Sequence, residues 1–177
     1  MKRNLVPIRD KIRADKRCER LMTLFQELPI YQLPIEDMTK EIEQIHKARG
    51  IRFLSQSSPR FIEAIVDASL LDQANRSRLT EISMACYKAH STLSEALDPL
   101  KTYLLLTYAS DLQGIRTKEE RNQIIYMALV PFFKFTSKVE QVRTLASMVI
   151  DDIDKGAYSL QRLIASYQIN SKREHTI

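Results

Sequence analysis

LTEISMACYKAHSTLSEALDPLKTY, residues 79–103, carries the strongest periodic pattern in the chain. Its apolar and small residues recur at alternating intervals of three and four, the spacing that places them on one face of an α-helix. We predict that this face is a packing or oligomer seam, buried within the fold or against a neighbouring subunit. The seam comprises Leu79, Ile82, Cys86, Ala89, Leu93, Ala96, Leu100 and Tyr103.

Pro99 interrupts this pattern and leaves two interpretations. Either Asp98 caps a new helix with Pro99 at its first position, or one long helix kinks at the proline. In both interpretations the seam continues into Leu104 and Leu105.

Upstream of the seam, further segments have helical signals. Ile35, Met38, Ile42 and Ile45 predict a helix of about 14 residues that ends at Gly50. The sequence Ser-Ser-Pro at 57–59 is typical of a helix start and predicts a separate short helix. The buried face of that short helix would hold Phe61, Ile62, Ile65, Val66 and Leu70.

Downstream of the seam, two capping boxes predict two helix starts. Thr117 and Glu120 form the first box, and the helix that follows is ended or bent by Pro131. Ser137 and Glu140 form the second box, which predicts another helix. The buried face of that helix would hold Val139, Val142, Ala146, Val149 and Ile153. A last helix is expected from 158 to 167. We expect the side chains of Phe132, Phe133 and Phe135 to lie in the core or in an interface, and not to form a platform for base stacking.

The chain has only three glycines, where average usage of about 7% would give roughly 12. Gly50, Gly114 and Gly156 each stand where a helical pattern ends, so we expect left-handed residues just past helix ends. We predict an all-α fold, a bundle of about six or seven helices around a long central helix, with a basic N-terminal helix or arm. We expect residues 1–34 to form the arm and its proline-containing connector, 35–170 the bundle, and 171–177 a polar C-terminal tail.

The net charge of +5 is confined to the first twenty residues. These carry eight basic and three acidic side chains, whereas the other residues hold equal numbers of both. If this segment is one helix, Arg9, Arg13, Lys16 and Arg20 form a stripe that suits an anionic surface. The predicted partner-binding residues are Lys2, Arg3, Arg9, Arg13, Lys16, Arg17 and Arg20. The alternative is a solvated helix that pairs with acids of the same chain, among them Glu36, Asp37, Glu41 and Glu43.

Few residues suggest catalysis. The chain has no Walker loop, GxGxxG, GxSxG or HExxH motif, and Cys18 and Cys86 have no CxxC spacing. We therefore expect a non-enzymatic protein with no catalytic residues, no cofactor and no metal. The cysteines suit a reducing compartment, cytoplasmic or virion-associated, and no apolar run is long enough to span a membrane.

Two acidic patterns raise the alternative of a carboxylate metal enzyme. Glu43 and His46 have the spacing of a di-iron ligand pair, but no second pair exists. Asp151 and Asp154 share a helical face with Asp152 nearby and could hold magnesium. Because acids near the end of a helix oppose its dipole, we favour ion pairs for this trio. The expected partners are Arg116, Lys118, Arg121 or the basic arm of a neighbouring subunit.

Together these patterns favour a non-enzymatic assembly or adaptor protein. We expect a helical homo-oligomer whose basic N-terminal segment contacts nucleic acid or an acidic protein surface. Viral connector and DNA-packaging subunits are small helical proteins of this general kind, a class-level analogy with no motif behind it. The main alternative is a DNA- or RNA-binding regulator in which the arm supplies the affinity.

Overall fold

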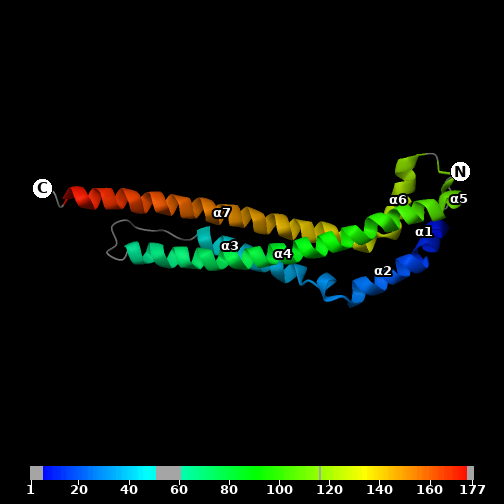
Figure 1. Ribbon diagram of the computed structural model, residues 1–177, viewed down its shortest axis with the longest axis horizontal. Helices are drawn as coiled ribbons and strands as arrows, with labels where there is room; N and C mark the ends of the chain where they lie inside the picture. The colour runs from blue at the N-terminus through cyan, green and yellow to red at the C-terminus, as the bar shows by residue number, and fades with distance from the viewer. Residues whose placement is uncertain (1–5, 51–60, 116, 175–177) are drawn as a thin grey trace. The chain divides into compact units, whose positions relative to one another are not determined.

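The computed structural model describes residues 6–50, 61–115 and 117–174, and it confirms the all-α prediction. No strand occurs within these ranges. Their elements are α1 (Val6–Arg13), α2 (Lys16–Glu27), the 3-10 turn η1 (Pro29–Tyr31), α3 (Ile35–Gly50), α4 (Phe61–Thr107), α5 (Ala109–Leu112), α6 (Lys118–Ala128) and α7 (Val130–Glu174). In Figure 1, α4 and α7 are long continuous ribbons. The long central helix of the prediction is α4, with 47 residues.

The chain divides into two compact units, each made of two separate stretches of sequence. Unit 1 comprises Met1–Ile35 and Ala85–Gln141, and unit 2 comprises Glu36–Met84 and Val142–Ile177. The N-terminal helices therefore belong to the same unit as the second half of α4, α5, α6 and the start of α7.

The core of unit 1 contains aliphatic side chains and an aromatic cluster. Phe25 of α2 meets Phe132 and Phe135 of α7 edge to face, with ring centroids 5.2 Å apart in both pairs. Aromatic pairs in this geometry are stabilising beyond the area that they bury. The cluster therefore fixes α2 against the start of α7.

Unit 2 is held by an apolar core and by ion pairs at its surface. Ile42 of α3 is fully buried, and Val149 and Ile153 of α7 are nearly so. Arg78 of α4 donates two hydrogen bonds to the Glu41 carboxylate of α3, at 2.7 and 3.0 Å. These contacts place α3 beside the first part of α4, as Figure 1 also shows.

The seam on α4 is buried at six of its eight predicted positions, while Ala96 and Tyr103 are partly exposed. Leu97 and Leu104 are buried in their place. A straight helix has 3.6 residues per turn, so a 3.5-residue pattern drifts around it. Leu104 lies five full turns after Cys86 and therefore faces the same direction.

Several predicted helix boundaries are wrong, because two long helices replace four shorter ones. The predicted short helix is not separate from the seam, because α4 begins at Phe61, runs into the seam and passes through Pro99 without ending. Of the predicted short-helix face, Ile65 is buried but Val66 and Leu70 are exposed, and the side chains of Phe61 and Ile62 lie outside the described residues. Ser137 starts no helix, because α7 already begins at Val130.

The prediction that each glycine marks the end of a helix is correct for two glycines and wrong for the third. Gly50 is the last residue of α3 and Gly114 lies in the turn after α5, but Gly156 lies inside α7. No glycine in the described ranges has a positive φ, so the expected left-handed conformation is also wrong. A Cβ atom at Gly156 would lie 2.6 Å from Nη2 of Arg49. This glycine therefore makes room for an arginine of α3.

Candidate partner-binding site on the N-terminal helices

The basic N-terminal segment is two helices rather than one. α1 ends at Arg13, and Asp15 caps α2 by accepting a hydrogen bond from the Arg17 backbone N–H at 2.8 Å. An N-cap residue has extended backbone geometry, and Asp15 has a ψ of 133°. The chain direction therefore changes at Asp15, and the predicted single stripe of cations from Arg9 to Arg20 is wrong.

Several of the predicted partner-binding cations already have partners within unit 1. Arg9 pairs with its neighbour Asp10 at 3.0 Å. Arg13 donates to the backbone carbonyls of Met127 and Ala128, at 3.2 and 3.4 Å. An arginine in this position satisfies carbonyls that the C-terminus of α6 leaves without an intrahelical partner. Two of the predicted cations, Lys2 and Arg3, lie outside the described residues.

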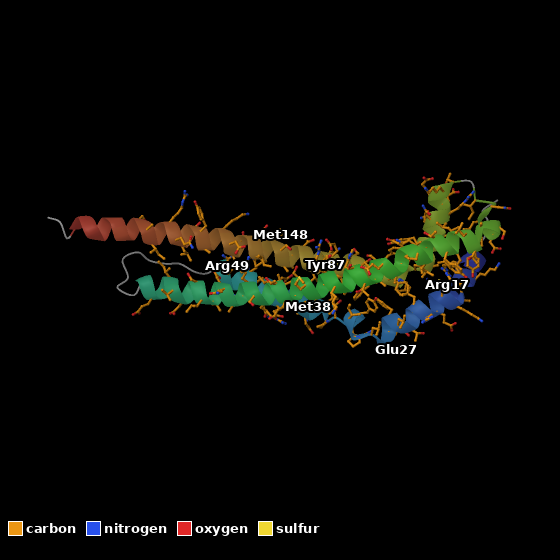
Figure 2. All side chains as sticks on the ribbon, viewed as in Figure 1. Arg17, Glu27, Met38, Arg49, Tyr87 and Met148 are labelled. Carbon is orange, nitrogen blue, oxygen red and sulfur yellow. The ribbon has the colours of Figure 1, made fainter. Side chains whose placement is uncertain are left out.

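Arg17 of α2, labelled in Figure 2, stacks on an aromatic ring of α4. Its guanidinium carbon lies 3.8 Å from the centroid of Tyr103. Cation–π stacking orients a guanidinium but leaves its N–H groups at the edge available to an acceptor. Arg17 is exposed, so it is held in place and still accessible.

Lys16 and Arg20 differ from these residues. Both side chains are exposed, and neither makes a hydrogen bond, an ion pair or a ring contact with the part of the chain that the structure describes. They stand four residues apart in α2, so they lie on one face of the helix. Together with Arg17 they form the candidate site, which we call the α2 cationic face.

A half-buried cluster around Asp15 supports this face. The Asp15 carboxylate accepts a hydrogen bond from the Tyr108 hydroxyl at 2.9 Å and a longer one from the Tyr103 hydroxyl at 3.4 Å. Burial, and then the hydrogen bond to Asp15, raise the pKa of Tyr108 to about 12. Lys11 pairs with Asp111 at 2.6 Å and lies over the Tyr108 ring. The cluster attaches both N-terminal helices to the end of α4 and to α5.

A groove of about 520 Å³ opens beside α2. Its lining comes from the end of α1, from α2 and from the junction of α6 and α7: Arg13, Cys18, Glu19, Met22, Thr23, Gln26, Ala128, Leu129, Pro131 and Phe132. Burial, and then the charge of Asp15, raise the pKa of the Cys18 thiol to about 11, so the thiol stays protonated at neutral pH and is a poor nucleophile. Because Arg13 and Glu19 balance each other in charge, the groove offers no net charge to an anion.

Two members of the acidic trio of α7, Asp152 and Asp154, form ion pairs within unit 2 as expected, but their partners are not the predicted ones. Arg76 holds the Asp154 carboxylate at 2.7 and 3.2 Å and lowers its pKa through these hydrogen bonds. Asp152 lies 3.9 Å from both His46 and Arg49. The helix continues to Glu174, so the trio does not lie in its last turns. Of the predicted partners, Arg121 donates instead to the Ile115 carbonyl, and Arg116 lies outside the described residues.

No known protein family, curated protein or solved structure matches this chain. Within the described ranges, no group of three or more His, Cys, Asp or Glu side chains is placed to hold a metal ion. None of the described helices combines the length and the apolar character that a membrane crossing needs.

Sequence reasoning missed two features of unit 1. The first is the role of Asp15 as the N-cap of α2. Aspartate is a preferred N-cap residue, and this preference is the signal that could have indicated its role. The second is the contact between Tyr126 of α6 and Phe133 of α7, whose rings stack with centroids 4.6 Å apart. No spacing rule links these two residues, because they lie on different helices.

Proposed function

We propose that the protein is a non-enzymatic helical assembly or adaptor protein that binds an anionic partner through the α2 cationic face. The observation that carries this proposal is that Lys16 and Arg20 are exposed and have no partner among the described residues, beside an Arg17 held in place by Tyr103. Nucleic acid and an acidic protein surface both offer the required anions.

The position of these cations in the helix supports the proposal. Lys16 and Arg17 are the first two residues of α2, where the helix dipole is positive and disfavours further positive charge. Like charges four residues apart also destabilise a helix, by about 0.2–0.5 kcal/mol. Asp15 and Glu19 offset part of this cost. A bound phosphate or carboxylate would offset the rest, so an anion is favoured at this end of α2.

A double charge reversal tests the α2 cationic face. We expect Lys16→Glu with Arg20→Glu to weaken binding to heparin or to a labelled oligonucleotide by about tenfold or more at 50 mM salt, because two phosphate contacts become repulsive. The measurement is heparin retention together with fluorescence anisotropy across a salt series, in which the variant should show a smaller salt slope.

The matched control reverses two other exposed cations of unit 1, Lys88 and Lys134, which have no partner in the described part of the chain. This control changes the net charge by the same amount. Equal losses in both double variants would mean that net charge alone drives binding, and would refute a specific face.

We also propose that the protein self-associates through the first turns of α4 in unit 2. Val66, Leu70 and Leu71 are 50%, 61% and 51% exposed there, and exposed apolar residues grouped in this way mark interaction surfaces. Homo-oligomers of helical proteins bury such residues against a second copy.

Solution mass tests self-association. We expect the unmodified protein to have the mass of a dimer or larger assembly by light scattering, and Leu70→Lys to reduce it to that of one chain, because a charge would be buried in the contact. Met148→Lys is the control, since Met148 is equally exposed but lies on α7. A monomeric mass for the unmodified protein would exclude this proposal.

A further inference from the structure

A second groove in unit 1, of about 660 Å³, is lined by α4, α6 and the start of α7. Its residues are Lys101, Leu105, Glu119, Asn122, Gln123, Ile125, Tyr126 and Phe133. This volume is within the range of sites that hold small organic groups. The first groove, beside α2, has no comparable aromatic surface, because its one aromatic residue, Phe132, is buried.

Two of the residues that line this second groove, Tyr126 and Phe133, stack on each other. The Tyr126 and Phe133 rings are inclined by only 21°, and Nζ of Lys101 lies 4.9 Å from the Phe133 centroid. Tyr126 is 49% exposed. A tyrosine half exposed at the end of an existing stack offers a π surface on which another planar group can continue the stack.

The rim beside Tyr126 is polar but carries little charge. Asn122 and Gln123 precede Tyr126 by four and three residues, so their amides lie on the same side of α6. Neither amide has a hydrogen-bond partner in the described part of the chain. An amide both donates and accepts hydrogen bonds, as the edges of nucleic-acid bases do.

The charges around the groove disfavour a phosphate inside it. Lys101 is already paired with Asp98 at 2.8 Å, and Glu119 adds a negative charge two turns before Tyr126. The groove therefore suits a neutral, planar group with hydrogen-bonding edges. Phosphates would instead be held elsewhere in unit 1.

Contacts between α1 and α6 connect this groove with the cationic residues. Arg13 donates to the carbonyl of Met127, the residue after Tyr126. Lys16 follows Arg13 by three residues, which span at most about 11 Å of chain. The groove and the α2 cationic face are thus connected through Arg13 within unit 1, and a single strand of about 20 nucleotides is far longer than this connection.

We propose that the Tyr126–Phe133 groove is a stacking site for an unpaired base of single-stranded nucleic acid. This inference rests on the proposed function and names its anionic partner. Bases of a duplex are stacked on each other, whereas single strands expose their faces to aromatic side chains. Single-stranded binding sites combine such a stacking surface with cations that track the backbone, and unit 1 contains both.

The test compares a labelled single strand of about 20 nucleotides with the matching duplex, by fluorescence anisotropy on the full chain. Tyr126→Ala is expected to weaken single-strand binding by about tenfold and to leave duplex binding unchanged, because only an unpaired base loses its stacking partner. Tyr126→Phe, which keeps the ring, should bind the single strand within about twofold of the unmodified protein. The single strand should also quench tyrosine fluorescence less in Tyr126→Phe than in the unmodified protein, and this difference reports the contribution of Tyr126 among the seven tyrosines of the chain.

The outcomes separate this inference from the proposed function. If Tyr126→Ala binds the single strand as tightly as the unmodified protein does, or loses single strand and duplex equally, the stacking site is wrong. If only the charge reversal of Lys16 and Arg20 weakens binding, the result supports the α2 cationic face and refutes the stacking site. If neither oligonucleotide binds the unmodified protein, the stacking site is again wrong, while heparin retention still decides the cationic face.

Discussion

Replacing Leu93 with alanine is expected to lower the free energy of unfolding by about 2–5 kcal/mol. Leu93 is fully buried in unit 1, on the face of α4 that also holds Ala89 and Leu97. The substitution removes apolar contacts and leaves a cavity that close-packed neighbours fill only in part. Urea denaturation followed by circular dichroism measures the loss.

The same substitution at Leu106 is the matched control. Leu106 lies on the same helix and in the same unit but is 73% exposed. Its replacement by alanine should change the stability by less than about 0.5 kcal/mol, as surface substitutions usually do. A loss below about 1 kcal/mol for Leu93→Ala would contradict its place in the core.

The fold class could be predicted because it depends on a pattern that is repeated over many residues. The seam of α4 and the shortage of glycine both indicate helices, and neither depends on long-range contacts. Helix ends are harder to predict than the fold class, because their signals are local and weak. Ser137 and Glu140 have the spacing of a capping box, yet α7 is already helical there, and burial of Val139 stabilises the helix across that point.

Gly156 shows why a residue type alone does not reveal its role. In the sequence it follows a run of acids and has the position of a helix stop. In unit 2 it lies inside α7, and the space left by its missing side chain receives Arg49, which donates to the Asp152 carbonyl at 3.0 Å. Figure 2 labels this arginine on α3. Such a close approach depends on how α3 packs, which spacing along the sequence does not encode.

The candidate site could be predicted in part. Counting charges located the basic segment, because charge asymmetry needs no structure. It did not separate residues with partners from those without: Arg13 contacts α6 and Arg17 stacks on Tyr103, whereas Lys16 and Arg20 have no such contacts in the described ranges. That distinction depends on which carbonyl or aromatic ring lies against each side chain in the folded unit, and a count of charges does not contain this information.

Replacing Asp15 with alanine is expected to lower the stability of the protein by about 1.5–5 kcal/mol. The variant loses the N-cap of α2, a loss of about 0.5–2 kcal/mol. It also leaves the part-buried Tyr108 hydroxyl without its acceptor, which costs about 1–3 kcal/mol. Asp15→Asn should recover much of this loss, because asparagine caps helices as well as aspartate does. Urea denaturation of the three proteins measures the difference.

Asp10→Ala is the matched control, because Asp10 is exposed and pairs only with its neighbour Arg9 in the described ranges. Its replacement should change the stability by less than about 0.5 kcal/mol. Equal losses at the two positions would contradict a capping role for Asp15.

The same cluster predicts a dependence of stability on alkaline pH. The pKa of Tyr108 is raised to about 12 in the folded protein, whereas an unperturbed tyrosine titrates near 10. The unfolded chain therefore loses this proton first, so the stabilisation is complete below pH 10 and is lost as the pH rises through 12.

Without the Asp15 carboxylate the pKa of Tyr108 falls, although burial still raises it. Tyrosinate absorbance should then show Tyr108 ionising at lower pH in Asp15→Ala than in the unmodified protein. Identical titrations of the two proteins would show that Asp15 does not contact Tyr108, and the support of the α2 cationic face by this cluster would be lost with it.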